Sequence, residues 1–284
     1  MNHKAHALRV GVGRGWTEFT QSLRSPQDQI SYVLMGVGVV AYLLIRRNTE
    51  VEGTGLMLPT VALPSILAGL LAYAVVVGPA YLLAMEREDG TLLRAKAVPN
   101  GMLGYVAGQL LYHSLNLVPM LATILIPSFL LFDDLMHRGS AGWFTMLWVV
   151  VLGLLATLPL GIIVGSLVPS VQKVGTWGML PILVLTGISG IFTSMDSLWG
   201  WLRAVGQMFP MYWMALGMRS AFLPEAAAAV EIGGSWRTPQ TVVVLSLWAA
   251  FGLTVGPVVL RRMAQKQSGS AVAAAKETAG QWIK

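Results

Sequence analysis

Residues 59–99 read PTVALPSILAGLLAYAVVVGPAYLLAM and then EREDGTLLRAKAVP, an uncharged apolar block that runs directly into a charged one. Residues 59–85 hold no charged side chain, and they exceed the about 20 residues that a helix needs to cross a hydrocarbon layer about 30 Å thick. The six charged side chains of residues 86–96 would cost on the order of 15 kcal/mol in that layer, at about 2.5 kcal/mol each. We therefore expect a transmembrane helix that ends at a segment held in water.

The rest of the chain repeats this apolar pattern. Hydrophobic residues make up 55% of the 284 residues and charged residues only 11%, whereas soluble domains carry about 25% charged residues. The fold class that this composition predicts is an all-α membrane protein with six transmembrane helices within residues 30–260. The predicted spans are Ile30–Ile45, Pro59–Met85, Met102–Phe132, Trp143–Val168, Val174–Thr193 and Thr241–Leu260. The first is short for a crossing, and Arg46 and Arg47 would extend it by reaching back to the interface.

The lysines and arginines predict which side of the membrane each loop faces. Thirteen of the 19 fall in segments that lie inside if both termini are cytoplasmic, and six fall in segments that then lie outside. On this orientation residues 1–29, 86–100 and 261–284 are cytoplasmic, and residues 194–240 form an outer segment. The protein is then a multi-pass protein of the cell membrane, and the net charge of +6 reports its topology. Nucleic acid is not an expected partner.

The segment before the first span has the pattern of a helix at the membrane surface. Trp16, Phe19 and Leu23 recur at helical spacing, with charged side chains on the other faces. We expect an elbow helix in the interface, and a frayed tail is the alternative. The glycine-rich residues 11–15 lie within this segment, and we expect them to be a flexible approach to the elbow. They are not an ATP-binding loop, because the lysine of the phosphate-binding pattern is missing.

Residues 194–240 are too long for a tight turn and too mixed for another crossing. Arg203 and Arg219 would be costly at the bilayer centre, which argues against a seventh span. Aromatic rings that favour the level of the lipid headgroups gather here: Trp199, Trp201, Tyr212, Trp213 and Trp236. We expect short re-entrant helices that rest at, or dip into, the outer interface. Four methionines at helical spacing predict either packing or an adaptable surface for apolar ligands: Met208, Met211, Met214 and Met218.

Gln109, His113 and Asn116 share one face of the third span, because they are four and three residues apart. Such a polar strip either contacts a substrate or joins helices through hydrogen bonds, and the spacing leaves both open. A lone histidine does not make a metal site and the chain has no cysteine, so we expect no metal site and no catalytic residue. Close helix contacts, within one subunit or between two, are predicted by two pairs of glycines: Gly104 with Gly108, and Gly161 with Gly165.

Two parts of the chain together resemble one known family. EREDGT at residues 86–91, a basic stretch and then Pro99 look like the loop between the second and third spans of the type-two ABC (ATP-binding cassette) export permeases. Residues 185–192 (LTGISGIF), 209–213 (FPMYW) and 216–219 (LGMR) are similar to the fifth span and outer region of that family. Ser194 and Leu198 stand where family members commonly have proline.

The resemblance implies a division of labour between subunits. This chain and a second copy or a homologue would join two ATPase subunits, which would bind ATP and Mg²⁺, so that this chain itself binds no cofactor. The loop at 86–100 would dock into a cleft on the ATPase beside the elbow helix. Its coupling residues would be four charged contacts, a turn glycine, two leucines in the cleft and a proline: Glu86, Arg87, Glu88, Arg94, Gly90, Leu92, Leu93 and Pro99. The cargo would be a lipophilic compound, such as a drug, an antibiotic or a lipid-like molecule.

Two other classes of protein are the alternatives. A membrane-embedded enzyme would need acidic or histidine side chains that meet at one depth, and His113 stands alone in the predicted spans. An ion-coupled secondary transporter would need intramembrane carboxylates or broken helices in two similar halves. The predicted spans contain neither aspartate nor glutamate. Export driven by a partner ATPase is therefore the function that we expect.

Overall fold

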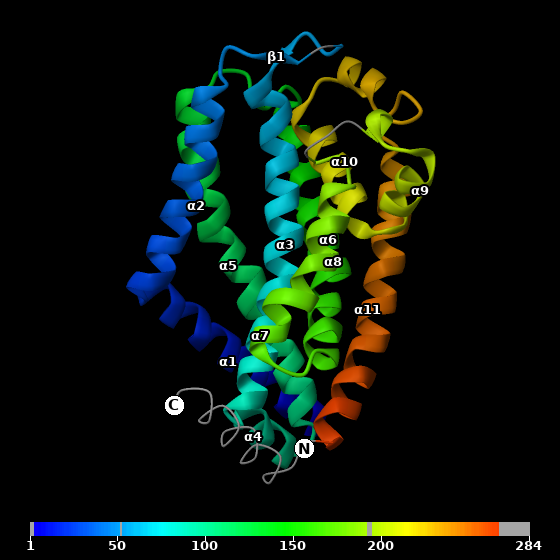
Figure 1. Ribbon diagram of the computed structural model, residues 1–284. Helices are drawn as coiled ribbons and strands as arrows, with labels where there is room; N and C mark the ends of the chain where they lie inside the picture. Colours follow the sequence, from blue (N-terminus) through cyan, green and yellow to red (C-terminus); the bar gives the residue numbers. More distant parts are fainter. Residues whose placement is uncertain (1–2, 52, 192–194, 267–284) are drawn as a thin grey trace, which may run out of the picture.

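The computed structural model describes residues 3–51, 53–191 and 195–266. Its long helices form an upright bundle, with a small β-hairpin and short helices at one end and α4 at the other (Figure 1). The first half contains α1 (His3–Arg24), α2 (Pro26–Ile45), β1 (Glu50–Val51), β2 (Leu56–Met57), α3 (Leu58–Glu88), α4 (Thr91–Ala97) and α5 (Gly101–Leu131). The second half contains α6 (Gly139–Leu167), α7 (Val171–Lys173), η1 (Val174–Gly178), α8 (Met179–Gly187), η2 (Met195–Ser197), α9 (Gly200–Met208), α10 (Pro210–Phe222), η3 (Glu225–Val230) and α11 (Thr238–Lys266). The antiparallel hairpin β1–β2 was not among the predicted elements.

Five helices are long and apolar enough to cross a membrane, and the chain is an all-α multi-pass membrane protein. They are α2, α3, α5, α6 and α11, which coincide with the first four predicted spans and the sixth. The first span is longer than predicted, because α2 starts at Pro26, where the Ser25 hydroxyl accepts the N–H of Asp28 at 3.3 Å. Proline suits the first turn of a helix, whose N–H groups have no partner within the helix. With 20 residues, α2 does not depend on Arg46 and Arg47 for its length.

The fifth predicted span, Val174–Thr193, is a composite of short pieces. α7 with three residues, the π-helical turn η1 with five and α8 with nine follow one another and end at Gly187. At 1.5 Å per residue this run is roughly 26 Å long, less than the hydrocarbon layer of about 30 Å. Beyond it Gly190 adopts a φ of 69°, a left-handed conformation that glycine adopts at little cost. A sixth full crossing is therefore not confirmed, and Thr193 lies outside the described residues.

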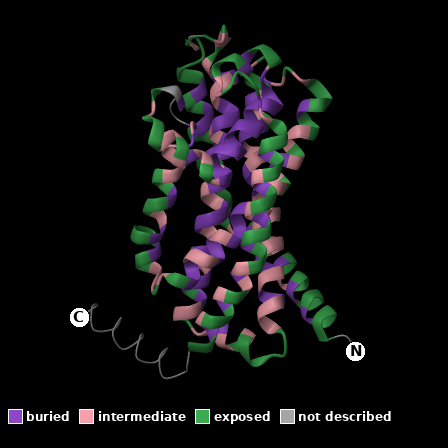
Figure 2. Cartoon of the chain, turned by 90° about the vertical axis from the view of Figure 1, so that its right-hand side faces the viewer, coloured by how far each residue is buried: buried purple, intermediate pink, exposed green. Residues whose placement is uncertain are grey.

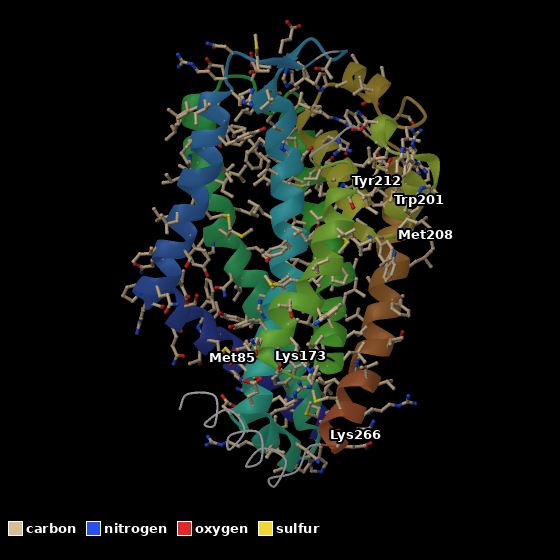
Figure 3. All side chains as sticks on the ribbon, viewed as in Figure 1. Met85, Lys173, Trp201, Met208, Tyr212 and Lys266 are labelled. Atoms are coloured by element: carbon tan, nitrogen blue, oxygen red, sulfur yellow. The ribbon has the colours of Figure 1, made fainter. Side chains whose placement is uncertain are left out.

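Short helices fill the outer segment. α9 and α10 form a hairpin that turns at Phe209, and the indole N–H of Trp248 in α11 donates to the Met208 carbonyl at 2.8 Å. Trp248 lies ten residues beyond the start of α11 at Thr238, so the turn is roughly 15 Å from that end of the bundle at 1.5 Å per residue. Figure 3 shows Met208 farther than Trp201 from the end of the bundle that carries the β-hairpin. α10 thus lies between the long helices, α9 lies beside it, and the position of both helices relative to lipid stays a prediction.

The densest part of the core surrounds α10. All 13 residues of α10 are buried. Figure 2 shows that buried residues are densest in the upper half of the bundle, nearer to the β-hairpin. α3, α6 and α11 pack around the helix. Met211, Met214 and Met218 belong to this core, so packing is the correct interpretation for these three. Met208, at the end of α9, is exposed.

Both glycine pairs make their close contacts within one chain. A Cβ atom at Gly11 would lie 2.0 Å from the carbonyl oxygen of Gly104, and one at Gly15 would lie 2.4 Å from that of Gly108. The backbones of α1 and α5 therefore touch, as small residues allow. The second pair contacts α3 in the same way, with Gly161 against Val76 and Gly165 against Ala80. The expected flexible approach at residues 11–15 is wrong, because these residues lie inside α1.

Candidate functional site

The charged segment continues α3 and then forms a helix of its own. α3 runs three residues beyond the predicted end at Met85, and α4 follows after the turn at Asp89 and Gly90. Gly90 has a φ of 86°, which favours glycine. The Asp89 carboxylate accepts the backbone N–H of Thr91 at 2.7 Å and satisfies one of the free donors at the start of α4. A short helix therefore sits at the end of the bundle, at an angle set by this turn.

Glu86 lies at the centre of a charged cluster that joins three helices. It is buried, and its carboxylate forms an ion pair with Arg14 of α1. Arg14 also pairs with Glu18 at 2.6 Å, and its guanidinium carbon lies 5.3 Å from the ring centre of Tyr105 in α5. Burial lowers the pKa of Arg14, but the two carboxylates raise it by more, so the pKa lies above its ordinary value. The cluster therefore fastens the end of α3 to α1 and α5.

The next two charged residues bind the connection between α6 and α7. Arg87 donates a hydrogen bond to the carbonyl oxygen of Val168. The Glu88 carboxylate accepts the backbone N–H of Val171 at 2.8 Å, and this N–H lies at the start of the short helical turn α7. Glu86, Arg87 and Glu88 are thus all engaged within the chain, and α3 is tied to its neighbours on two sides.

The outer face of α4 is the part of the segment that is open to a partner. Leu92 is only 1% exposed and packs in this chain's own core, and Leu93 is half-buried. Arg94 and Pro99 are exposed. Lys173 and Lys266 lie at this same end of the bundle (Figure 3). Of the eight predicted coupling residues, Arg94 and Pro99 are therefore the two that are exposed.

α1 has two distinct faces. Gly11 and Gly15 meet α5, whereas Trp16 is 55% exposed and Leu23 is also exposed. Phe19 is half-buried, and its ring centre lies 5.9 Å from that of Trp16. The frayed-tail alternative is wrong, because residues 3–24 form one helix. Its place in the membrane interface stays a prediction.

A comparison of the sequence with models of protein families finds a match to one family. The model of the ABC-2 type transporter family matches residues 16–223, from α1 to the residue after α10. This is well over half of the chain. The chain belongs to the ABC-2 type transporter family. Comparison with curated proteins gives no match.

The polar strip of this ABC-2 transporter lies between two helices. The Gln109 side-chain oxygen is 3.1 Å from the His113 Nε2 atom. The His113 ring fits against Gly78 of α3, where a Cβ atom would come within 3.0 Å of the ring. Gln109 is buried, and the Asn116 side-chain oxygen is buried without a hydrogen-bond partner among the described residues. The arrangement of Gln109 and His113 is that of helix packing, and contact between this strip and a substrate stays a prediction.

A second polar group of the transporter lies near the end of the bundle that carries the β-hairpin. One of its members can be recognised in the sequence. The Arg219 side chain pairs with Glu231 through two hydrogen bonds, of 2.5 and 3.1 Å. It also donates to the Ser65 hydroxyl at 3.3 Å and to the Gly190 carbonyl at 3.0 Å. Arg219 stands out in the sequence because it interrupts an apolar helix, but nothing in the pattern indicates that its partner follows 12 residues later. The group lines a cavity of about 700 Å³.

Proposed function

We propose that this ABC-2 transporter is the permease subunit of an ATP-driven exporter that moves a lipophilic compound out of the cell. A separate ATPase subunit would bind and hydrolyse ATP with Mg²⁺. The observation that carries the proposal is α4, a helix with an exposed charged face that hangs from the end of α3 through the turn at Gly90. Family membership supports the same role.

A force on α4 would reach several helices at once. Glu86 joins the end of α3 to α1 through Arg14, while Arg87 and Glu88 join it to the α6–α7 connection. The glycine contacts join α1 to α5. On this proposal the ATPase moves the ends of α1, α3 and α5 as one unit, because rigid helices and ion pairs connect them.

The proposed orientation places α4 and both termini in the cytoplasm. The start of α1, α4 and the end of α11 lie at one end of the bundle (Figure 1), which agrees with the excess of lysine and arginine in these segments. The proposed exporter contains a second permease copy. Exposed apolar side chains on η1 and α8, among them Trp177, Leu180 and Leu183, would face that copy or lipid.

Charge reversal at Arg94 tests the coupling role. Arg94 is exposed, so Arg94→Glu should leave the fold intact, weaken ATPase binding and reduce export. The readouts are co-purification of the ATPase subunit with the permease, and ATP-dependent accumulation of a lipophilic dye inside inverted vesicles, whose outer surface is the cytoplasmic side. Arg47→Glu, at the opposite end of the bundle, is the matched control. Glu86→Arg should also uncouple export, but it disturbs the pair with Arg14 as well. Unchanged ATPase binding and export in both Arg94→Glu and Glu86→Arg would contradict the proposal.

A further inference from the structure

The cavity near the β-hairpin end of the bundle has an apolar wall and a polar end. Its volume is about 700 Å³, which lies within the range of about 300 to 1,000 Å³ for small-molecule sites. The apolar wall comes from α2, α3 and the chain after α8, and includes Leu34, Val39, Val61, Ile66, Ile191 and Met195. The polar end consists of Arg219, Glu231 and Ser65. Such a division fits a ligand with an apolar body and one polar head.

The polar end is a built site and not an accident of the surface. The side chains of Arg219 and Glu231 are 6% and 9% exposed, and Ser65 is buried as well. Four of the five N–H groups of Arg219 donate to Glu231, Ser65 and the Gly190 carbonyl. The Glu231 carboxylate accepts two of these bonds, which leaves acceptor capacity for a ligand.

The net charge of this polar end determines whether a charged or an uncharged head group binds there. Arg219 and Glu231 neutralise each other through two hydrogen bonds. A charged head would lose its hydration on entry and would meet no uncompensated opposite charge, so that its desolvation cost would not be offset. A hydroxyl or amide head gives up far less hydration and can still bond to Glu231 or Arg219.

We propose that this cavity binds one molecule of a single-tailed amphipath with an uncharged, hydrogen-bonding head. The head lies at Arg219 and Glu231, and the tail lies between α2 and α3 against Leu34, Val61 and Ile66. The inference deepens the proposed function and rests on it only for the ligand's role as cargo. The same chemistry is available from a membrane lipid and from an exported compound, and the experiment below separates the two.

Three photoreactive probes with the same C18 tail test the binding. A monoacylglycerol has an uncharged head, an alkyl sulfate has an anionic head, and an alkylamine has a cationic head. The full-length permease is placed in lipid nanodiscs without an ATPase, illuminated with each probe, and digested for mass spectrometry. We expect the monoacylglycerol to label α2 and α3 around the cavity about tenfold more than either charged probe.

A glycine on the cavity wall provides the blocking variant. Gly38 lines the cavity, and a Cβ atom there would meet no heavy atom within 4 Å. A side chain can therefore start at position 38 without a clash, and Gly38→Phe should occupy part of the cavity and reduce labelling by the monoacylglycerol about tenfold. Gly13→Phe is the matched control, because Gly13 also lies in a helix with open space around its Cβ position but far from the cavity.

A second variant tests how the head is chosen. Glu231→Gln leaves the Arg219 charge without its counter-charge, so the preference should shift from the monoacylglycerol to the alkyl sulfate. If this variant fails to fold, Gly38→Phe still decides the matter. Wild-type labelling that favours a charged probe, or labelling that Gly38→Phe leaves unchanged, overturns the proposal.

The complex of permease and ATPase then distinguishes cargo from lipid. If the monoacylglycerol binds and also stimulates ATP hydrolysis in a Gly38-dependent way, the cavity is a cargo site. If it binds without stimulation, the cavity holds a membrane lipid, and the proposed site still stands. Failure of binding in the permease alone overturns this inference and leaves the exporter proposal to the Arg94→Glu experiment.

Discussion

Glu86 holds a buried charge at the point where α3 reaches the end of the bundle. Buried carboxylates in proteins are almost always paired, and here Arg14 supplies the counter-charge. Arg14 also forms an ion pair with Glu18, four residues along the same helix. Because the partner of Glu86 sits on α1 and not on a second protein, Glu86 positions the end of α3 within the chain. The exposed Arg94 is the better candidate for direct contact with a partner.

At the residue scale, removing Arg14 should destabilise the protein. Arg14→Ala leaves Glu86 buried without its counter-charge, and we expect a loss of about 1 to 3 kcal/mol in unfolding free energy, less than for a fully buried pair because Arg14 is partly exposed. The measurement is thermal unfolding in detergent, followed by tryptophan fluorescence. Arg9→Ala, on the exposed side of α1, should melt like the wild type.

The double variant Arg14→Met with Glu86→Leu supplies a further control. It removes both charges and keeps side chains of similar size, so that it should recover much of the lost stability. Equal melting temperatures for Arg14→Ala and Arg9→Ala would show that the ion pair does not hold α1 to α3.

At the scale of elements, α1 depends on glycines that let it approach α5. Gly11 and Gly15 lie on one face of α1, and each meets a backbone carbonyl of α5 closer than a Cβ atom allows. A neighbouring face carries the exposed Trp16. A helix that is clamped on one face and has an exposed aromatic ring on the next is suited to lie against the bundle and the membrane surface together.

This packing predicts opposite effects for two neighbouring glycines. Gly11→Ala places a methyl group about 2 Å from the Gly104 carbonyl oxygen, so that α1 must move away from α5, and we expect a clear fall in melting temperature. Gly13→Ala meets no atom within 4 Å and should be neutral or stabilising by up to about 1 kcal/mol, because alanine favours helix. Tolerance of Gly11→Ala at the level of Gly13→Ala would refute the contact.

The α9–α10 hairpin has a hydrogen-bonded anchor that can be removed while an aromatic ring is kept. The ring centres of Trp248 and Phe209 lie 5.7 Å apart, and Trp248→Phe keeps a ring at this position but removes the N–H that donates to Met208. We expect a loss of about 1 kcal/mol in unfolding free energy. Trp199→Phe, in an exposed position, serves as the control. A larger loss in Trp199→Phe than in Trp248→Phe would speak against the anchor.

At the scale of the whole molecule, the fold brings α4, the first described helix and the last described helix together at one end of the bundle. The start of α1, α4 and the end of α11 lie at one end, and the β-hairpin, α9 and η3 lie at the other (Figure 1). This arrangement holds whether the composite segment α7–η1–α8 crosses the membrane completely or stops short. Which end of the bundle faces the cytoplasm is therefore one property of the molecule that a single kind of experiment can test.

Single-cysteine labelling can measure that property, because the chain has no cysteine of its own. Cysteines at Ala5, Ala97 and Gln265, which are exposed at the α4 end, should react with an impermeant maleimide only after the membrane is opened. Cysteines at Asn48 and Ala226, which are exposed at the hairpin end, should react in intact cells. The reverse pattern would contradict the proposed orientation, and a mixed pattern at one end would contradict the bundle.

Local patterns sufficed for the features that depend on neighbouring residues. The apolar blocks predicted five of the long helices, since each must satisfy its own backbone hydrogen bonds in lipid. Helical spacing predicted the helix that carries Trp16, Phe19 and Leu23. The motif at Glu86–Thr91 indicated the family that the match over residues 16–223 confirms. Each of these signals lies within one segment of the chain.

Contacts between distant segments depended on the tertiary structure. The resemblance implied that Glu86 contacts an ATPase, and the fold buries this carboxylate against Arg14, 72 residues away. The same holds for Arg219, whose cost in an apolar core is offset by Glu231, Ser65 and Gly190 from three other parts of the chain. Apolar helices thus follow from composition alone, because transfer from water to lipid is a property of each segment. The partners of buried charges follow only from packing, because a counter-charge acts over a few ångströms in space whatever its distance along the chain.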